Sequence, residues 1–182
     1  MKKGPFVETA RRTIYRTPWL WVEEARVIRP DGSPGLFGLA HVVPGTTVVA
    51  LDDAHNVFLV KEYKYAVERE TIELISGGID DGETPIQAAR RELHEETGYV
   101  AGRLSEIGVV APFTTIVSGS IHMMLAQDLA YRPGEAIGDD VVQPFRVPFR
   151  QALDMLEAGV ITHAPSCVAL LRAARLIAAG AR

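Results

Sequence analysis

The pattern of apolar and polar positions predicts a strand-rich first part of the chain. β-Branched and aromatic residues are frequent over residues 6–30, which favours an antiparallel hairpin. Turn-forming residues fill 30–35, and apolar positions resume over 36–43. The runs 46–51 and 57–65, separated by the turn-like DDAHN, predict a second hairpin. Further short strands are expected at 72–75, 108–111, 121–126 and 143–147.

The apolar period changes to that of a helix after residue 84. One apolar helix stripe is predicted from Ile86, Ala89, Leu93 and Thr97. Thr84 suits the N-cap, Pro85 the first helical position and Gln87 the third position of a capping box, while Gly98 suits the end of the helix. Two more helices are expected over 148–157 and 165–176. Strand runs flanking helices without βαβ regularity predict an α+β fold, with helices on the faces of a mixed sheet.

Composition narrows the class of protein. The 182 residues are 47% hydrophobic and 23% charged, which excludes a disordered or fibrous chain and favours one globular domain with an N-terminal addition. The net charge of −4 disfavours general nucleic-acid binding. The lone Cys167 cannot form an intrachain disulfide, and the sequence has neither a signal-peptide pattern nor a long apolar stretch. We therefore expect a cytoplasmic protein without a membrane partner.

Three carboxylates are crowded at the end of the predicted long helix. Glu92, Glu95 and Glu96 lie at i, i+3 and i+4, and each like-charged pair disfavours the helix by roughly 0.2–0.5 kcal/mol. Arg91 could pair with a neighbouring carboxylate, and a divalent cation such as Mg²⁺ would offset the remaining charge. The alternative is a solvated acidic helix end. The glycine-rich segment 77–82 before the helix favours a ligand site, because its backbone is free to face a ligand.

The segment Gly77–Tyr99 resembles the Nudix box at every defined position, from Gly77 through Glu83 to the run R-E-U-x-E-E-x-G-U that starts at Arg91. The resemblance implies a Nudix α/β/α sandwich that binds Mg²⁺ or Mn²⁺ and hydrolyses a pyrophosphate linked to a nucleoside. It also implies particular roles. The metal ligands would be Glu92 and Glu96, with Glu95 assisting and Ser76 contributing its carbonyl; Glu95 and Arg91 would be catalytic.

Residues 13–175 resemble the ADP-ribose and nucleoside diphosphate sugar pyrophosphatase branch of that family. The matching pieces include the Tyr-Lys-Tyr strand around Lys64 and the E-L-I-S-G entry to the box, which begins at Glu73. The resemblance implies that Lys64 and Glu73 contact a nucleotide-sugar substrate and that Trp21, or alternatively Trp19, stacks on its base. Each of these side chains also suits an ordinary structural place. Residues 6–43 resemble the extra sheet that this branch exchanges in a homodimer. We therefore expect an N-terminal β extension over 1–43 and a Nudix domain over 44–182.

Two departures from this branch concern the loop 113–120. A proline typical of ADP-ribose enzymes is replaced by Thr114 or Thr115, and the loop lacks the glutamate that usually binds metal or activates water. The acidic loop downstream offers a substitute general base, with Asp140 as the first candidate. Its alternatives are Glu135 and Asp139. His122 has apolar neighbours and is expected to be a core or edge histidine.

Two other functions are compatible with the sequence. One is a Nudix hydrolase for another nucleoside diphosphate derivative, such as coenzyme A, NADH or a dinucleoside polyphosphate. The other is a non-catalytic module that senses a nucleotide. The second would be expected if box carboxylates were lost, whereas Glu92, Glu95 and Glu96 are all present, so hydrolysis is favoured.

Overall fold

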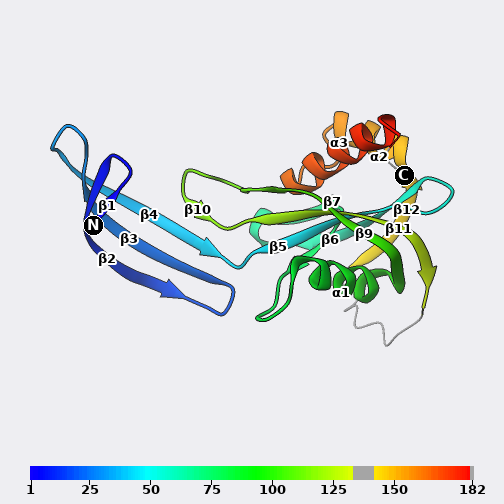
Figure 1. Cartoon of the computed structure of the whole chain (residues 1–182), viewed down its shortest axis with the longest axis horizontal. Helices are drawn as coiled ribbons and strands as arrows, with labels where there is room; N and C mark the ends of the chain where they lie inside the picture. The colour runs from blue at the N-terminus through cyan, green and yellow to red at the C-terminus, as the bar shows by residue number, and fades with distance from the viewer. Residues whose placement is uncertain (133–141, 181–182) are drawn as a thin grey trace. The chain divides into compact units, whose positions relative to one another are not determined.

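A computed structural model describes residues 1–132 and 142–180, and these residues cluster into two compact units (Figure 1). The first, here called the N-terminal unit, comprises Met1–Pro44 and Ala111–Ser120. The second, the core unit, comprises Gly45–Val110 and Ile121–Arg182. The loop 113–120 therefore clusters with the N-terminal strands. No helix in the described part of the chain is long and apolar enough to cross a membrane.

The N-terminal unit is one five-stranded sheet in the order β1-β2-β3-β4-β10. Its strands are β1 (Lys2–Lys3), β2 (Phe6–Arg16), β3 (Leu20–Ile28), β4 (Pro34–Val42) and β10 (Val117–Ser118). The first four pair antiparallel, and β10 lies parallel to β4. The predicted hairpin over 6–30 is confirmed as β2 and β3. The following turn is closed by Asp31, whose Oδ1 accepts a hydrogen bond from the Ser33 amide at 2.9 Å.

The core unit contains two sheets in the orders β8-β5-β11-β9 and β12-β6-β7. Their strands are β5 (Gly45–Ala50), β6 (Asn56–Lys64), β7 (Arg69–Glu73), β8 (Ile75–Gly78), β9 (Tyr99–Val110), β11 (Ile121–Tyr131) and β12 (Gln143–Pro148). The helical elements are η1 (Tyr65–Val67), α1 (Pro85–Thr97), α2 (Phe149–Glu157) and α3 (Ala164–Ala178). Because β5 and β11 are parallel and the other pairs antiparallel, the fold is α+β with a mixed sheet.

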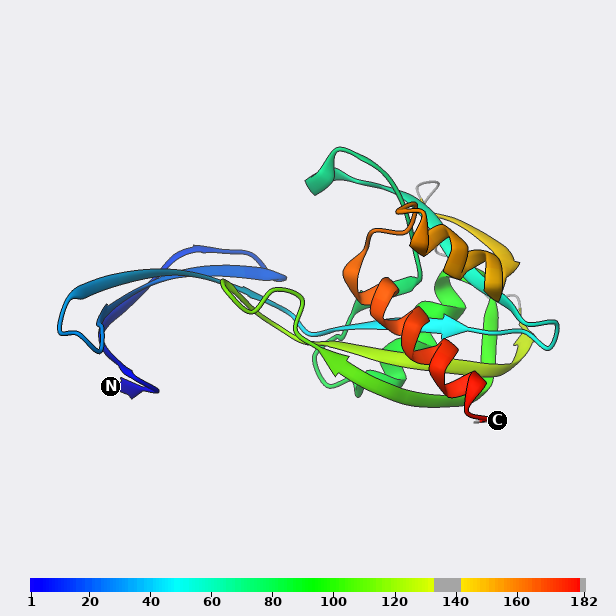
Figure 2. The ribbon, with the colours of Figure 1, turned by 90° about the horizontal axis from the view of Figure 1, so that it is seen from above.

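Helices cover both faces of the strands in the core unit. In Figures 1 and 2, α1 lies on one side of the strands and α2 and α3 lie on the other. Successive residues of β5 belong to different cores: Val48 packs with Ala89 and Leu93 of α1, whereas Val49 packs with Ala169 of α3. This alternation follows from the two-residue period of a strand. The result is the expected α/β/α sandwich.

The predicted hairpin of 46–51 with 57–65 is wrong. The turn between these runs does form, and Asp52 Oδ1 accepts amide hydrogen bonds from Ala54 and Asn56. However, β5 and β6 share only the bridge between Leu51 and Val57, and then each joins a different sheet. Residues 46–51 and 57–60 are buried on both faces, so each run is stabilised as an inner strand with neighbours on both edges.

The predicted ends of the long helix are confirmed. Thr84 Oγ1 accepts a hydrogen bond from the Gln87 amide at 3.3 Å, and Gln87 Oε1 accepts one from the Thr84 amide at 2.8 Å. At the other end, Gly98 adopts the left-handed conformation with φ 74°, and its amide donates to the His94 carbonyl. These caps fix where α1 begins and ends, and hence the position of the carboxylates along it.

Candidate active site

Arg91 connects the carboxylates of the predicted box. Its Nε and Nη2 donate to the two carboxylate oxygens of Glu83, both at 3.0 Å, which is a bidentate pair. Its Nη1 donates to Glu92 Oε1 at 2.7 Å and to Glu95 Oε2 at 3.2 Å. The hydrogen bonds from Arg91 hold the pKa of Glu83 below its usual value. The arginine therefore orients three acidic side chains at once.

Glu92 lies directly against the backbone of Gly77 in β8. A Cβ atom placed on Gly77 would come within 1.9 Å of Glu92 Oε1, so only glycine allows the carboxylate this position. The next carbonyl, that of Gly78, accepts a hydrogen bond from Arg91 Nη2 at 2.9 Å. Burial raises the pKa of Glu92, while the Arg91 contact opposes that rise. The glycine loop and the helix thus form one site, as the sequence pattern indicates.

Glu96 is the most perturbed carboxylate of α1. Burial, together with the nearby charges of Glu92 and Glu62, raises its pKa to about 8. Among the described residues, Glu96 Oε2 is the one buried side-chain oxygen or nitrogen that has no hydrogen-bond partner. A buried, unpartnered carboxylate oxygen beside other carboxylates is suited to a hard divalent cation. The residues present therefore fit a metal ion.

Ser76 precedes Gly77 in β8, and its side chain is directed into the core. Its hydroxyl donates to the Leu74 carbonyl at 2.9 Å and lies 2.6 Å from Thr47 Oγ1. Within residues 1–132 and 142–180, no three His, Cys, Asp or Glu side chains already converge as a metal cluster. Mg²⁺ is usually bound by one or two protein carboxylates, and water and substrate phosphate supply the rest of its coordination.

The side chains of Lys64 and Glu73 project from the face of the sheet β12-β6-β7 that packs against α1. Val60 of β6 packs in the core beneath α1, and the two-residue period places Glu62 and Lys64 on the same face. Glu73 of β7 lies opposite Val60 in the register, and its side chain is buried. The charges of Glu62, Lys64 and Glu73 all act on the pKa of Glu96. The fold thus brings two of the three predicted substrate residues, Lys64 and Glu73, close to the carboxylates of α1.

Two charged or titratable residues near this cluster were not expected from the sequence. Glu62 forms an ion pair with Lys64. Because Glu62 lies two residues before Lys64 on β6, the two-residue period of a strand could have placed it on the same face from the sequence alone. His163, just before α3, places Nδ1 3.4 Å from Glu73 Oε2, and burial lowers its pKa. No local pattern connects residues ninety positions apart, so only the fold reveals this contact.

The remaining candidates are Trp21, His122 and the acidic residues of the downstream loop. Trp21 belongs to the N-terminal unit, where its ring stacks on His41 with centroids 4.8 Å apart and an angle of 3° between the planes. Asp140 and its alternatives Glu135 and Asp139 are outside the described residues. His122 is neither a core nor an edge histidine: it lies partly buried on the inner strand β11, with Nδ1 2.7 Å from Glu106 Oε2 on β9.

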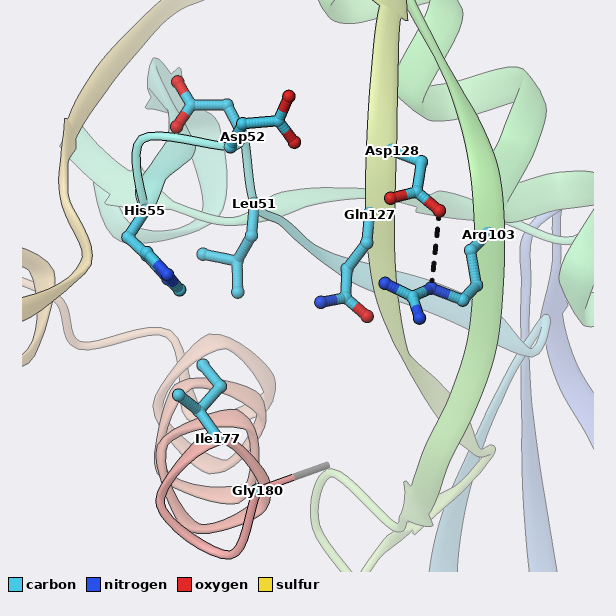
Figure 3. Close-up of a pocket in the computed structure, with 9 residues that line it drawn as sticks. Leu51, Asp52, His55, Arg103, Gln127, Asp128, Ile177 and Gly180 are labelled. Atoms are coloured by element: carbon cyan, nitrogen blue, oxygen red, sulfur yellow. Dashed lines mark ion pairs between the residues drawn. The ribbon is translucent and has the colours of Figure 1, made fainter. Parts of the chain in front are cut away.

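A separate cavity of about 610 Å³ lies at the turn after β5 (Figure 3). Figure 3 shows Ile177 of α3 facing the turn that carries Asp52 and His55, and the ion pair between Arg103 and Asp128 at 3.5 Å. None of the residues that line it belongs to the segment 77–99. This cavity is therefore distinct from the carboxylate site.

Two protein-family models match the chain, and one of them spans the candidate active site. The NUDIX domain matches residues 42–165, and the nucleoside diphosphate sugar hydrolase N-terminal domain matches residues 9–39. The second match lies within β2, β3 and β4 of the N-terminal unit.

The chain is similar in sequence to two bacterial pyrophosphatases and in fold to an ADP compounds hydrolase. An ADP-ribose pyrophosphatase of Bacillus subtilis is 28% identical over 153 residues, covering 83% of this chain and 82% of the relative. A GDP-mannose pyrophosphatase of Cronobacter sakazakii is 29% identical over 124 residues, covering 63% of this chain and 64% of the relative. A crystal structure of an ADP compounds hydrolase superposes over 100% of both chains with a TM-score of 0.86 at 22% identity, which shows a shared fold.

Proposed function

The chain belongs to the NUDIX family, and on this basis we propose that it hydrolyses the pyrophosphate of nucleoside diphosphate sugars to a nucleoside monophosphate and a sugar phosphate. The observation that carries the proposal is Glu96, whose buried carboxylate has an unpartnered oxygen and lies on the helix that also carries Glu92 and Glu95. The match of residues 9–39 to a nucleoside diphosphate sugar hydrolase domain and the names of the relatives support the substrate class.

NUDIX hydrolases generally need a divalent metal ion, and we propose Mg²⁺ or Mn²⁺ here. Glu92 and Glu96 would hold it, with Glu95 and the Ser76 carbonyl assisting. When bound, such an ion neutralises charge on the diphosphate oxygens and lowers the pKa of an attacking water. The chain's own contribution is orientation, because Arg91 fixes the carboxylates of Glu92 and Glu95 by hydrogen bonds at 2.7 and 3.2 Å.

We propose that Lys64 and Glu73 contact the substrate beside the metal. The ammonium group of Lys64 is suited to a phosphate, and the buried Glu73 carboxylate is suited to accept hydrogen bonds from sugar hydroxyl groups. Trp21, in the N-terminal unit, is proposed to stack on the base. Its place within the segment that matches the sugar hydrolase N-terminal domain supports this role.

Asp140 is proposed as the general base, because the loop 113–120 contains no acid. An interaction made mainly in the transition state affects kcat more than KM. Asp140→Asn should therefore keep KM for the nucleotide sugar and lower kcat, with Asp139→Asn and Glu135→Gln as parallel variants. Normal kcat in all three would exclude this loop, and Glu95 would be tested next.

A substrate panel tests the function directly. The purified protein with Mg²⁺ is assayed against ADP-ribose, GDP-mannose, UDP-glucose, NADH and coenzyme A, and the released nucleoside monophosphate is quantified. We expect the highest turnover on one of the nucleotide sugars and no turnover in EDTA. Turnover that persists in a metal-free preparation would contradict the mechanism. Tight binding without any turnover would identify a sensing module instead.

Charge-removing variants test the carboxylate assignment. Glu92→Gln and Glu96→Gln preserve side-chain shape but remove a metal-facing charge, so each should lower kcat by at least about 10²-fold with the fold intact. Glu157→Gln is the matched control, since Glu157 is exposed on α2. If the variants of Glu92 and Glu96 both kept the kcat and Mg²⁺ dependence of the Glu157 control, neither residue would be a metal ligand.

A further inference from the structure

Leu74 lies at the point where the chain passes from one sheet of the core unit to the other. β7 ends at Glu73 in the sheet β12-β6-β7, and β8 begins at Ile75 in the sheet with β5. Leu74 belongs to neither strand, and its side chain is fully buried. A buried amide or carbonyl without a partner costs about 1–3 kcal/mol. The amide and the carbonyl of Leu74 therefore need partners other than the backbone of a neighbouring strand.

Two serine side chains provide these partners. The Leu74 amide donates to Ser166 Oγ at 2.9 Å, and the Leu74 carbonyl accepts from Ser76 Oγ at 2.9 Å. Ser166 lies in the first turn of α3, and it is fully buried. Ser76 Oγ in turn lies 2.6 Å from Thr47 Oγ1 of β5. A continuous chain of hydrogen bonds thus runs from α3 through Leu74 and Ser76 to β5.

His163 connects this chain of hydrogen bonds to Glu73, which is predicted to contact the substrate. Its Nδ1 lies 2.8 Å from Ser166 Oγ and 3.4 Å from Glu73 Oε2. The other carboxylate oxygen of Glu73 accepts a hydrogen bond from Thr71 Oγ1 at 2.8 Å. His163, the N-cap residue of α3, therefore lies between the hydroxyl of Ser166 and the carboxylate of Glu73.

The position of Leu74 affects the carboxylate site because the chain continues directly into it. Ser76 and Gly77 follow in β8, and the space that a Cβ on Gly77 would occupy is filled by the Glu92 carboxylate. A small displacement of the Leu74 peptide would thus shift the strand against which Glu92 lies. Sites of this kind need ligands held to within about 0.5 Å by the residues behind them.

We propose that Ser166 is a positioning residue for the metal site. By holding the Leu74 amide, it fixes the strand that carries the Ser76 carbonyl and brings Gly77 against Glu92. The inference rests on the proposed function only in taking these groups as the metal site. It adds a residue of α3, ninety positions from Ser76, to the groups on which metal binding depends.

The test measures metal binding in the absence of substrate. Mn²⁺ is titrated into the metal-free full-length protein by isothermal calorimetry for the wild type, Ser166→Ala and Thr47→Val. Residues that orient metal ligands typically contribute about 10–100-fold to metal affinity. We therefore expect a Kd for Mn²⁺ at least about tenfold higher in Ser166→Ala, and KM for the nucleotide sugar at saturating Mg²⁺ within about twofold of wild type. Thr47→Val removes the hydroxyl at the other end of this chain of hydrogen bonds and preserves side-chain shape. This variant should also weaken Mn²⁺ binding.

Cys167→Ala is the matched control. Cys167 is the next residue of α3, and its Sγ contacts the Ile161 carbonyl rather than Leu74, so the Kd for Mn²⁺ should not change. Ser166→Thr keeps a hydroxyl and should restore wild-type affinity. If Ser166→Ala does not fold, Thr47→Val decides the result by the same measurement.

Three results would overturn the inference: an unchanged Kd in both Ser166→Ala and Thr47→Val, an equal loss in Cys167→Ala, or no Mn²⁺ binding by the wild type. Failure of the proposed function looks different. A wild type that binds Mn²⁺, loses affinity in Ser166→Ala and yet hydrolyses no nucleotide sugar would support the positioning role and contradict the proposed substrate.

Discussion

At the scale of single residues, the acidic groups of the site differ in their contacts with Arg91. Arg91 donates hydrogen bonds to Glu83, Glu92 and Glu95, whereas Glu96 Oε2 has no hydrogen-bond partner among the described residues. The pKa of Glu83 is consequently lowered, whereas burial raises the pKa of Glu96 to about 8. Environments that separate the pKa values of neighbouring carboxylates are typical of functional sites.

The raised pKa of Glu96 predicts how stability depends on pH in the metal-free protein. The folded state binds the proton more tightly, with a pKa of about 8 against 4.5 for an ordinary glutamate. The resulting stabilisation is complete below the ordinary pKa and is lost as pH rises through 8. In EDTA, Tm should therefore fall more between pH 5 and about 8.5 for the wild type than for Glu96→Gln. Equal pH dependence in the two proteins would exclude this account, and saturating Mg²⁺ should reverse the loss.

Gly77 allows a test that separates catalysis from stability. In Gly77→Ala the new methyl group meets the end of the flexible Glu92 side chain, which can swing aside, so the free energy of unfolding should change by less than about 1 kcal/mol. The displaced carboxylate should lower kcat by about 10²-fold, the cost of a misplacement of about 1 Å. Gly38→Ala, where a Cβ meets open space, is the control. Unaltered kcat with an intact fold would show that the position of Glu92 is not critical.

At the scale of elements, α1 is held by contacts within its own sequence. Thr84 and Gln87 form a reciprocal capping box, and Gly98 ends the helix in the left-handed conformation. The strands are different, because β5 has its partners in β8 and β11, far along the chain. The helix that carries the carboxylates is therefore specified locally, whereas the strand that faces it is specified by the fold.

Removal of the cap should destabilise the protein without altering its chemistry. Thr84→Ala leaves the Gln87 amide without its partner and should lower the free energy of unfolding by about 1 kcal/mol. Urea denaturation measures this change, and kcat should stay near that of the wild type. Gln151→Ala, at an exposed position within α2, provides the control and should alter stability by less than about 0.5 kcal/mol. If kcat of Thr84→Ala fell by more than its folded fraction, the cap would contribute to catalysis as well as to stability.

At the scale of the whole molecule, the N-terminal sheet leaves large apolar side chains exposed. They include Ile14, Tyr15, Trp19, Leu36 and Phe37. We propose that residues 6–43 form a homodimer interface, which would cover some of these exposed apolar side chains.

We expect the wild type to be a homodimer in multi-angle light scattering. Deletion of residues 1–43 should give a monomer with a raised KM for the nucleotide sugar. Because the deletion also removes β4, the partner of β10, the single substitution Leu36→Asp is a milder test that should shift the equilibrium towards monomer. A wild type that stays monomeric at about 100 μM would exclude the interface.

The sequence alone determined the features that depend on neighbours along the chain. The capping box at Thr84, the Gly98 end, the order of glutamates on α1 and the hairpin over 6–30 all follow from residues within one turn or one tight loop of each other. The intact box also identifies the family, because its spacing is itself the signal.

Only the tertiary structure decided which distant groups meet. The turn between β5 and β6 is visible in the sequence, but the two strands separate because burial on both faces gives each its own long-range partners. In the same way, Ser166 reaches Leu74 from 92 positions away. Local propensity has no information on such contacts, since they depend on which sheet edges and helix ends pack together. The environment that raises the pKa of Glu96 exists only after that packing.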